Sequence, residues 1–272
     1  MNAPMIDPSA RVAAGAQIGR DCTIGAYCTL GPHVTLADGC RLMSHVNVAG
    51  ATSIGARTVV YPFASLGTPP QSVKYRGGAT RLMIGADCDI REHVTVNIGT
   101  EDGGGVTQVG DRCFLMVGAH IGHDCKVGND VAVANNVLIA GHVEIGDHVV
   151  FGGAAAVRQF VRIGEGAMIV GMSGARADVI PWGLLLDGPL GHLAGLNVIG
   201  LRRKGYAKAD ILALRAAYES LFFGEGEFRA RLDRIEGENG GQPLIAKMIA
   251  FIRAGKRPLT MAIKRNAAED EL

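Results

Sequence analysis

The chain of 272 residues carries 27 basic and 26 acidic side chains and is 48% hydrophobic, a balance typical of a globular protein and not of a polycation that binds nucleic acid. No run of about eighteen apolar residues occurs, and the N-terminus lacks a basic segment followed by an apolar one. We therefore expect a cytoplasmic protein without a membrane span. Glycine, with 39 residues, has roughly twice its usual share, which indicates a chain that turns often.

An apolar residue returns at every sixth position from residue 6 to residue 66, and the same rhythm resumes after two interruptions. Many of these residues precede a glycine, as in IGRDCT, IGADCD and VGNDVA. The first positions of the hexads are Ile6, Val12, Ile18, Ile24, Leu30, Leu36, Leu42, Val48, Ile54, Val60, Leu66, Ile84, Ile90, Val96, Val109, Leu115, Ile121, Val127, Val133, Ile139, Ile145, Phe151, Val157, Ile163 and Ile169.

A period of six fits a short strand followed by a corner, with one large side chain pointing inward per segment. Three segments close one coil, and eight or nine coils stacked at about 4.8 Å make a prism about 40 Å long. We therefore predict a mainly β fold, a parallel β-helix over residues 1–180. The repeat resembles the hexapeptide family, which implies that the β-helix is left-handed, against the usual hand of β crossover connections.

All six cysteines take the fifth position of a hexad, where the other occupants are mostly small or β-branched. Cysteine packs like a small hydrophobe, so we expect these side chains to point inward and not to bind metal. No Cys-x-x-Cys pair is present, and a cytoplasmic chain needs no disulfides. The six positions are Cys22, Cys28, Cys40, Cys88, Cys113 and Cys125.

Two histidines depart from the common pattern, in the segment AHIGHDCKVGND. His33, His45, His93, His142 and His148 all take the fourth hexad position, which we interpret as an outward-facing corner. His120 takes the sixth position and His123 the third. With Asp124 beside it, a neutral His123 could act as a general base, because its unperturbed pKa lies near 6.5 and a carboxylate can orient the ring.

The two interruptions predict loop excursions from the prism, near residues 67–83 and 97–108. The first holds Lys74, Tyr75 and Arg76, which suit a phosphate or an acidic surface. The second holds a run of three glycines, 103–105, which could wrap a phosphate but lacks a following Gly-Lys-Ser/Thr. A mobile polar loop is the alternative for each.

The hexads end before residue 181, and we predict a C-terminal helical domain over residues 181–272. The segment VIPWGLLLDGPLGH is interpreted as a linker, and KADILALRAAYESLFF places apolar residues at helical spacing. Further helices are expected near 226–236 and 243–254. Short helices need a partner surface, so this region should pack on the prism or on a neighbouring subunit.

Six segments carry a more specific resemblance: LGTPPQSVKY, VNIGTEDGGG, VGAHIGHDCKVGN, IAGHVEIGD, AAVRQF and GLNVIGLRRKGY, in this order. Together they resemble the UDP-N-acetylglucosamine 3-O-acyltransferase family of lipid A biosynthesis, strongly over about residues 5–206 and loosely beyond. The resemblance implies a homotrimer with active sites between neighbouring prisms. It also implies transfer of a 3-hydroxyacyl group from acyl carrier protein to the UDP-sugar, with a phosphopantetheine thioester as donor and no cofactor.

By the same resemblance, His123 is the general base, Asp124 supports it, and the backbone N–H of Gly141 stabilises the oxyanion. Gly171 and Met172 fall where the family measures the length of the acyl chain. The positions implied for substrate binding are Gln71, Ser72, Lys74, Asn97, His120, His142, Arg158 and Gln159 for the acceptor, and Asn197 and Arg203 near the nucleotide.

The chain also departs from the family pattern near the expected acceptor site. Asn97 and Ile98 replace the first two residues of the usual His-Arg-Gly-Thr, Ser72 stands for a common aspartate, and Arg158 for a common histidine. Loss of the His-Arg pair is associated with relatives that acylate a 3-amino analogue of the sugar and make an amide. The 3-hydroxyl and a 3-amine therefore both remain possible acceptors.

Other protein classes share the repeat. A sister N-acyltransferase of the pathway carries a separate domain before its repeats, whereas the hexads here begin at Ile6. A trimeric β-helix carbonic anhydrase would bind zinc through three histidines, but its His-x4-His spacing is missing. A non-catalytic solenoid would show an uninterrupted face of repeated threonines. Another hexapeptide acyltransferase is the remaining alternative.

Overall fold

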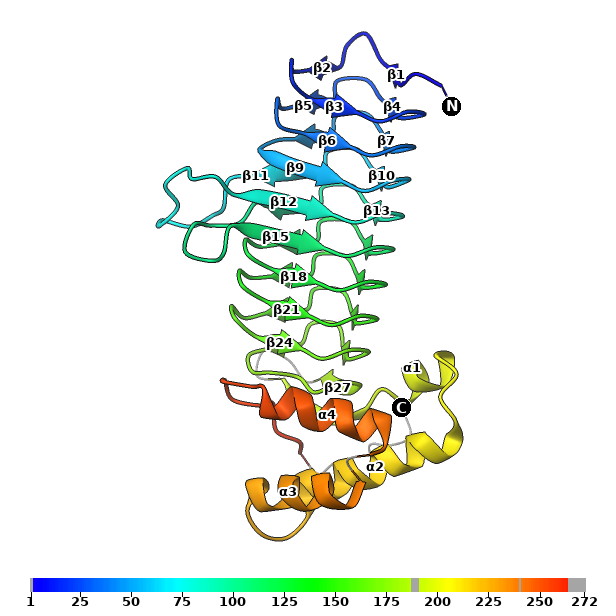
Figure 1. Cartoon of the computed structure of the whole chain (residues 1–272), viewed down its shortest axis with the longest axis vertical. Coiled ribbons are helices and arrows are strands. Elements are labelled where there is room, and N and C mark those ends of the chain that lie inside the picture. The colour runs from blue at the N-terminus through cyan, green and yellow to red at the C-terminus, as the bar shows by residue number, and fades with distance from the viewer. Residues whose placement is uncertain (1, 187–190, 240, 264–272) are drawn as a thin grey trace.

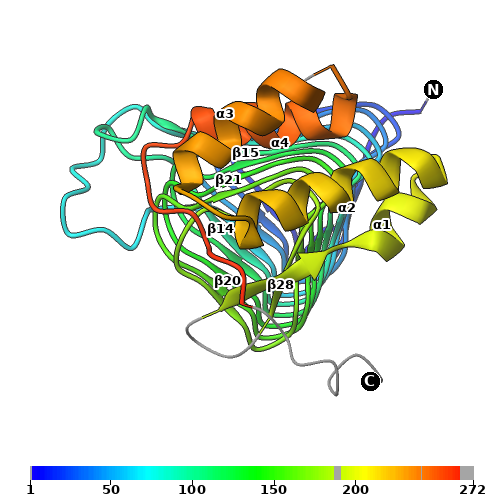
Figure 2. The ribbon, with the colours of Figure 1, turned by 90° about the horizontal axis from the view of Figure 1, so that it is seen from below.

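The computed structural model, which describes residues 2–186, 191–239 and 241–263, is a three-sided β-helix with four helices at its C-terminal end (Figure 1). Strands in the front sheet of Figure 1 point to the right while the coils descend, so the β-helix is left-handed. The end view in Figure 2 shows the triangular outline. The prediction of a left-handed parallel β-helix followed by helices is confirmed.

Every coil places one short strand in each of three sheets, named here sheets A, B and C. Sheet A contains β1 (Met5–Ile6), β4 (Thr23–Ile24), β7 (Arg41–Leu42), β10 (Val59–Val60), β13 (Asp89–Ile90), β16 (Phe114–Leu115), β19 (Ala132–Val133), β22 (Val150–Phe151), β25 (Met168–Ile169), β27 (Gly183–Leu186) and β28 (His192–Leu196). Sheet B contains β2 (Arg11–Val12), β5 (Thr29–Leu30), β8 (Asn47–Val48), β11 (Ser65–Thr68), β14 (Thr95–Asn97), β17 (His120–Ile121), β20 (Leu138–Ile139), β23 (Ala156–Val157) and β26 (Gly174–Ala175). Sheet C contains β3 (Gln17–Ile18), β6 (Thr35–Leu36), β9 (Ala51–Ile54), β12 (Arg81–Ile84), β15 (Val106–Val109), β18 (Lys126–Val127), β21 (Glu144–Ile145) and β24 (Arg162–Ile163).

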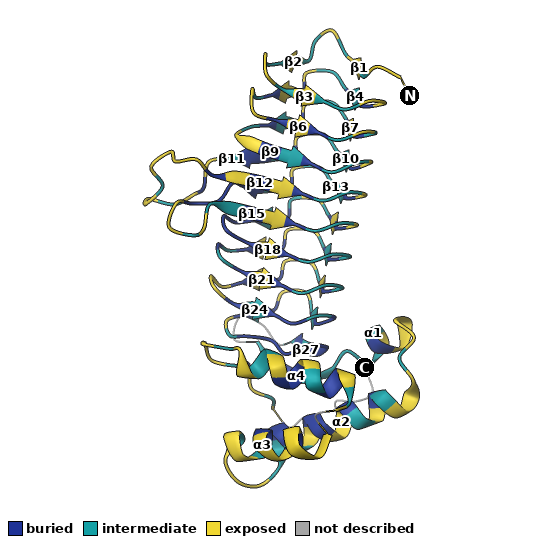
Figure 3. Cartoon of the chain, in the orientation of Figure 1, coloured by how far each residue is buried: buried dark blue, intermediate teal, exposed yellow. Residues whose placement is uncertain are grey.

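The core of the prism is built from the first and fifth positions of the hexads. Successive coils pair in parallel and in register, so that Ile121 lies between Val96 and Ile139. These first-position side chains are buried from Ile24 onward, as the dark bands of Figure 3 show. All six cysteines are free and buried, as predicted. Burial raises the pKa of the Cys125 thiol to about 12, and its Sγ lies 3.1 Å from the carbonyl oxygen of Ala140.

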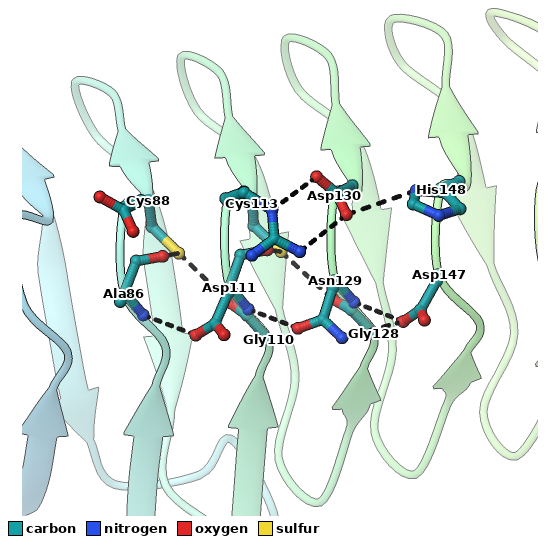
Figure 4. A network of polar contacts seen from close by, with 12 residues as sticks. Ala86, Cys88, Gly110, Asp111, Cys113, Gly128, Asn129, Asp130, Asp147 and His148 are labelled. Carbon is teal, nitrogen blue, oxygen red and sulfur yellow. Dashed lines mark hydrogen bonds and ion pairs between the residues drawn. The ribbon is translucent and has the colours of Figure 1, made fainter. Parts of the chain in front are cut away.

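The corners explain why the repeat selects Asp, Asn, His and Gly. Most residues at the fourth hexad position have left-handed φ values, such as 60° at Asp124 and 58° at Asn136, a conformation that Asn, Asp and His tolerate better than most. At one corner, third-position side chains also accept hydrogen bonds from the backbone of the preceding coil (Figure 4). Oδ1 of Asp111 accepts from the N–H of Ala86, and Oδ1 of Asn129 accepts from the N–H of Asp111, both at 2.8 Å.

Two excursions interrupt the coils at a single corner. Residues 69–80 join β11 to β12, and residues 98–105 join β14 to β15, so both leave sheet B and return to sheet C. Figure 2 shows them projecting from the same edge of the triangle. They lie where the broken rhythm predicted loops, although β12 and β15 begin a few residues earlier than expected and are longer than the usual two-residue strands.

The C-terminal region closes one end of the prism. Part of the segment interpreted as a linker belongs to the sheet: residues 183–186 form β27, which continues sheet A, and β28 pairs with it antiparallel, whereas residues 187–190 lie outside the described residues. The rhythm fails there, but the backbone hydrogen bonding of the sheet still continues. The helices are α1 (Val198–Arg203), α2 (Lys208–Phe223), α3 (Phe228–Asn239) and α4 (Pro243–Arg253).

The helices pack as the apolar spacing predicts. Ile211, Leu214, Tyr218, Leu221 and Phe222 on α2 are all buried. Helix α4 is tied to the prism by Arg162, whose guanidinium lies 4.3 Å from the ring centroid of Phe251 and also pairs with Asp178. No helix among the described residues is long and apolar enough to span a membrane. The last nine residues of the expected C-terminal domain, 264–272, lie outside the described residues.

Candidate active site

The corner that leads from sheet B to sheet C brings the predicted catalytic residues together. We call it the BC corner, formed in three consecutive coils by residues 122–125, 140–143 and 158–161. Third-position residues along this edge are His123, Gly141 and Gln159, and fourth-position residues are Asp124, His142 and Phe160. Both excursions leave the prism at the same edge, in the two coils before that of His123.

His123 and Asp124 form a buried hydrogen-bonded pair. Nδ1 of His123 lies 2.7 Å from Oδ2 of Asp124, and the Asp124 side chain has no exposed surface. A carboxylate only accepts hydrogen bonds, so Nδ1 of His123 must donate. In the neutral ring, Nε2 then carries the lone pair and is free to accept a proton. The geometry therefore fits the general base that the sequence predicts.

Gly141 lies beside the His123 ring in the next coil. A Cβ atom at position 141 would lie 2.7 Å from Cε1 of His123, so only glycine leaves room for the ring in this position. Among the described residues, the N–H of Gly141 has no backbone acceptor, whereas its carbonyl accepts from Phe160. An uncommitted N–H beside a general base is suited to stabilise an oxyanion.

The ring of His142 links the pair to an aromatic stack. It meets His123 edge to face at 4.9 Å and stacks on Phe160 at 4.4 Å with an interplanar angle of 7°. The guanidinium of Arg257 also contacts Phe160 and lies 4.8 Å from the centroid of its ring. Burial lowers the pKa of His142, although the nearby Asp124 carboxylate opposes this effect.

His120 projects from β17, one hexad position before the buried Ile121. Its Nδ1 lies 2.8 Å from Oγ1 of Thr95, the residue paired with it on β14. Burial, followed by the neighbouring His123, lowers the pKa of His120. The lowered pKa favours the neutral imidazole, and the contact with Thr95 fixes the orientation of the ring near His123.

The remaining acceptor positions divide between the excursion and the outer surface. Gln71 and Lys74 are exposed on residues 69–80, with Ser72 half-buried between them. Arg158 and Gln159 are exposed on the BC corner. These side chains are available to a ligand without rearrangement of the core.

Asn97 and Ile98, the two departures from the family motif, are both buried at the base of the excursions. Nδ2 of Asn97 donates to Oγ1 of Thr68 and to the carbonyl oxygen of Pro69, both at 3.1 Å, and so joins the two excursions. Oδ1 of Asn97 has no hydrogen-bond partner within the described part of the chain. Ile98 belongs to the hydrophobic core.

Four predicted positions lie away from the BC corner. Gly171 and Met172 are exposed at the corner between sheets A and B. Asn197 and Arg203 line a separate cavity of about 670 Å³ beside sheet A, whose wall includes His148 and Trp182. Oδ1 of Asn197 accepts from the N–H of Gly200 and so caps α1. A single chain therefore does not bring all the predicted residues to one place.

His123, Asp124 and His142 are close enough to be considered as a metal site, because their ligand atoms lie within 4.8 Å of one another. Both carboxylate oxygens of Asp124 are, however, already engaged. Oδ1 accepts from the backbone of Thr100, and Oδ2 accepts from the Thr100 hydroxyl and from His123. The donor set fits an oriented imidazole better than a metal centre.

Comparison with known proteins shows the family to which the chain belongs. Residues 178–260 match the model of the second domain of UDP-N-acetylglucosamine O-acyltransferases, and residues 107–141 match the bacterial transferase hexapeptide model. A protein of Azorhizobium caulinodans named acyl-[acyl-carrier-protein]–UDP-N-acetylglucosamine O-acyltransferase is 53% identical over all of both chains. The chain belongs to the UDP-N-acetylglucosamine acyltransferase family.

Solved structures of the UDP-N-acetylglucosamine acyltransferase family agree over nearly the whole chain. A crystal structure described as UDP-N-acetylglucosamine acyltransferase superposes with a TM-score of 0.92 at 36% identity, covering 95% of this chain and 99% of that one. The enzyme of that name from Campylobacter jejuni gives 0.89 at 35% identity, covering 95% and 100%. The family assigned from sequence motifs is confirmed.

Sequence reasoning missed the residues that hold Asp124 in this acyltransferase. Thr100 and Thr107 both form hydrogen bonds with Asp124. Neither residue occupies a hexad position that the sequence pattern marks as functional. One signal was available for Thr100: it is one of the two residues of the family's His-Arg-Gly-Thr motif that this chain keeps. Phe160 and Arg257 were missed because their contact joins segments far apart in the sequence.

Proposed function

We propose that this protein transfers a 3-hydroxyacyl group from acyl carrier protein to the 3-hydroxyl of UDP-N-acetylglucosamine, the first step of lipid A biosynthesis. The observation that carries the proposal is the buried pair of His123 and Asp124 beside the uncommitted N–H of Gly141. A base and an oxyanion donor at one edge are the two groups that acyl transfer to a hydroxyl requires.

The chemical steps follow from this arrangement. Nε2 of His123 takes the proton of the sugar 3-hydroxyl as its oxygen attacks the thioester carbonyl carbon. The negative charge that develops on the carbonyl oxygen is stabilised by the N–H of Gly141, and Asp124 stabilises the imidazolium. When the carbon–sulfur bond breaks, His123 returns the proton to the leaving thiolate, so the base is regenerated. The reaction needs no cofactor, because the thioester itself supplies the activated acyl group.

We also propose that the working form is a homotrimer. The predicted positions lie on three parts of the prism: the BC corner, the corner between sheets A and B, and the cavity beside sheet A. If neighbouring prisms lie side by side, Met172 or Arg203 of one chain can approach His123 of another. Residues on different faces then serve one site, whereas a monomer would leave each face incomplete. The substrates and the cytoplasmic location are expected to be those of the family.

The named relatives favour oxygen over nitrogen as the acceptor atom. The Azorhizobium caulinodans and Paracoccus denitrificans proteins, 53% and 51% identical, are both called O-acyltransferases. The amide alternative came from the replacement of the His-Arg pair by Asn97 and Ile98. Because both side chains are buried, their replacement does not by itself present a new group to an amine.

The decisive experiment supplies purified protein with 3-hydroxyacyl carrier protein and either UDP-N-acetylglucosamine or its 3-amino analogue. The expected product has the mass of an ester of UDP-N-acetylglucosamine and is cleaved by mild base. A product from the 3-amino sugar alone would replace the proposed acceptor. Absence of transfer to both sugars would reject the proposed function. Activity unchanged after dialysis against a chelator is expected, since no step requires a metal.

A further inference from the structure

We infer that Thr100 and Thr107 are positioning residues for the catalytic base: they fix the Asp124 carboxylate so that His123 presents Nε2 to the acceptor. This inference rests on the proposed function for its kinetic consequence. It assigns a role in the reaction to residues 98–105, the second excursion, rather than leaving them as a surface loop.

The excursion reaches Asp124 with two hydrogen bonds from one residue. The backbone N–H of Thr100 donates to Oδ1 of Asp124 at 2.8 Å, and the Thr100 hydroxyl donates to Oδ2 at 2.6 Å. Oδ2 is also the atom that meets Nδ1 of His123. The two bonds from Thr100 prevent rotation of the carboxylate about its Cβ–Cγ bond, and so fix the acceptor for the imidazole.

Thr107 holds the backbone of Asp124. Its Oγ1 accepts a hydrogen bond of 2.8 Å from the N–H of Asp124, whose φ is 60°. An aspartate in this left-handed conformation is less stable than a glycine would be, so an added hydrogen bond helps to keep it there. Thr107 has no exposed surface and Thr100 is only 6% exposed, so water cannot readily replace either hydroxyl.

The excursion is shaped to fit the carboxylate. A Cβ atom on Gly103 would lie 2.1 Å from Cγ of Asp124, so the turn packs its bare backbone directly on the carboxyl group. The N–H of Gly103 donates to Oγ1 of Thr100 at 3.1 Å, and the N–H of Gly105 donates to the carbonyl oxygen of Thr100 at 2.9 Å. Thr100 is therefore itself held in place, and the excursion completes the burial of Asp124.

The chemical consequence concerns the tautomer of His123. With Asp124 fixed, Nδ1 of His123 carries the ring proton, and Nε2 is free to take the proton of the sugar hydroxyl. Without the Thr100 hydroxyl, Oδ2 loses a donor in a buried site and the carboxylate is less constrained. A larger fraction of His123 would then carry its proton on Nε2, where it cannot act as a base.

The test uses Thr100→Val, which removes the hydroxyl at nearly constant shape, and Thr100→Ser, which keeps it. We expect kcat of Thr100→Val to fall at least about tenfold while KM for both substrates changes less than about twofold, and Thr100→Ser to recover most of the rate. Thr107→Val and Thr107→Ser should show the same order with a smaller loss.

The matched control is Thr58→Val, which removes a hydroxyl with two hydrogen bonds, to Gly85 and Cys88, at another corner. It should lower stability but leave kcat unchanged.

A second readout does not require turnover. In protein with ring-¹⁵N histidine, the His123 signals, assigned by their loss in His123→Gln, should show the Nδ1-protonated tautomer in the wild type and a mixture in Thr100→Val. A folded Thr100→Val with wild-type kcat and an unchanged tautomer overturns the inference. Equal loss in Thr100→Ser and Thr100→Val also overturns it, because packing and not the hydroxyl would then matter. If the wild type transfers no acyl group, the proposed function fails, and the tautomer measurement still decides the role of Thr100.

Discussion

Gly141 and His123 occupy the same hexad position in successive coils, and the space that a side chain would fill at 141 holds the His123 ring. A Cβ at Gly141 would lie 2.7 Å from Cε1 and 2.8 Å from Nε2 of that ring. The glycine thus serves two purposes: it makes room for the ring of His123, the proposed base, and it leaves an N–H beside that ring.

Gly141→Ala should therefore impair catalysis more than folding. The added methyl group displaces the His123 ring, and a shift of about 1 Å in a catalytic group can lower the rate by about 100-fold. We expect kcat to fall at least about tenfold, measured by product formation with acyl carrier protein thioester. Gly153→Ala is the matched control, because the corresponding Cβ would have only an ordinary contact, 3.6 Å from the carbonyl oxygen of Asn135. Equal activity of the two variants would contradict this account.

Replacing the two residues of the pair should have graded effects. His123→Ala removes the proposed base, and we expect kcat to fall by about 100- to 10,000-fold with the fold preserved. Asp124→Asn keeps the shape but can donate to Nδ1, which favours the wrong tautomer, so kcat should fall by at least about tenfold. Circular dichroism and gel filtration should match the wild type. Full transfer by a folded His123→Ala variant would show that another group is the base.

Most of the prism could be predicted from the sequence because the fold is local and periodic. One inward side chain per six residues fixes the strands, the corners and the burial of residues such as Ile121 and Cys125. Interruption of the same rhythm locates both excursions. Where the hexad pattern is absent, the sequence does not predict the strand. The segment that contains β27 carries no hexad and is interpreted as a linker, yet β27 continues sheet A through backbone hydrogen bonds.

The site was predicted less completely, for a geometric reason. His123 and Asp124 are neighbours in sequence, and Gly141 follows one coil later, so their proximity follows from the coil length. The bonds from Thr100 to Asp124 depend on the path of an excursion outside the rhythm. The contact of Arg257 with Phe160 depends on how the C-terminal segment returns to the prism. Neither path is encoded in a repeat.

Truncation of one inward side chain should test the core independently of catalysis. Leu42 is 1% exposed and lies between Ile24 and Val60 in sheet A. We expect Leu42→Ala to lower the free energy of unfolding by about 2–5 kcal/mol, because it leaves a cavity in a column that cannot collapse. The neighbouring Arg41 is exposed on the same strand, and Arg41→Ala should change stability by less than about 0.5 kcal/mol. Urea denaturation measures both, and similar losses in the two variants would contradict the inward assignment.

The buried imidazoles predict how stability depends on pH. The pKa values of His120 and His142 are lowered, first by burial, so their folded forms bind protons less readily than the unfolded chain does. Both states leave these rings neutral above the ordinary pKa of about 6.5. As the pH falls below that value, the unfolded state takes up protons first, and the folded state loses stability until the lowered pKa values are passed.

The urea midpoint of the wild type should therefore fall between about pH 7.5 and pH 5.5, and part of that fall should disappear in His120→Asn with His142→Asn. His33→Asn serves as the control, because His33 is exposed at a corner of the prism. An identical pH dependence in the wild type and the double variant would show that these two rings do not carry the effect.

Ala154 offers a test of the corner conformation itself. It takes the fourth hexad position with a φ of 56°, is exposed, and has neither the short polar side chain of Asp or Asn nor the freedom of glycine. Its Cβ therefore contributes steric cost without a compensating contact.

Ala154→Gly should raise the free energy of unfolding by roughly 0.5–1 kcal/mol, since the relief of that cost exceeds the extra entropy that glycine gives the unfolded chain. Ala154→Val, with a branched side chain at the same φ, should lower it. Thermal and urea unfolding of the three proteins should give the order Gly, Ala, Val from most to least stable. The reverse order would mean that the corners tolerate a left-handed backbone without steric cost, and that the preference for Asp, Asn, His and Gly there has another origin.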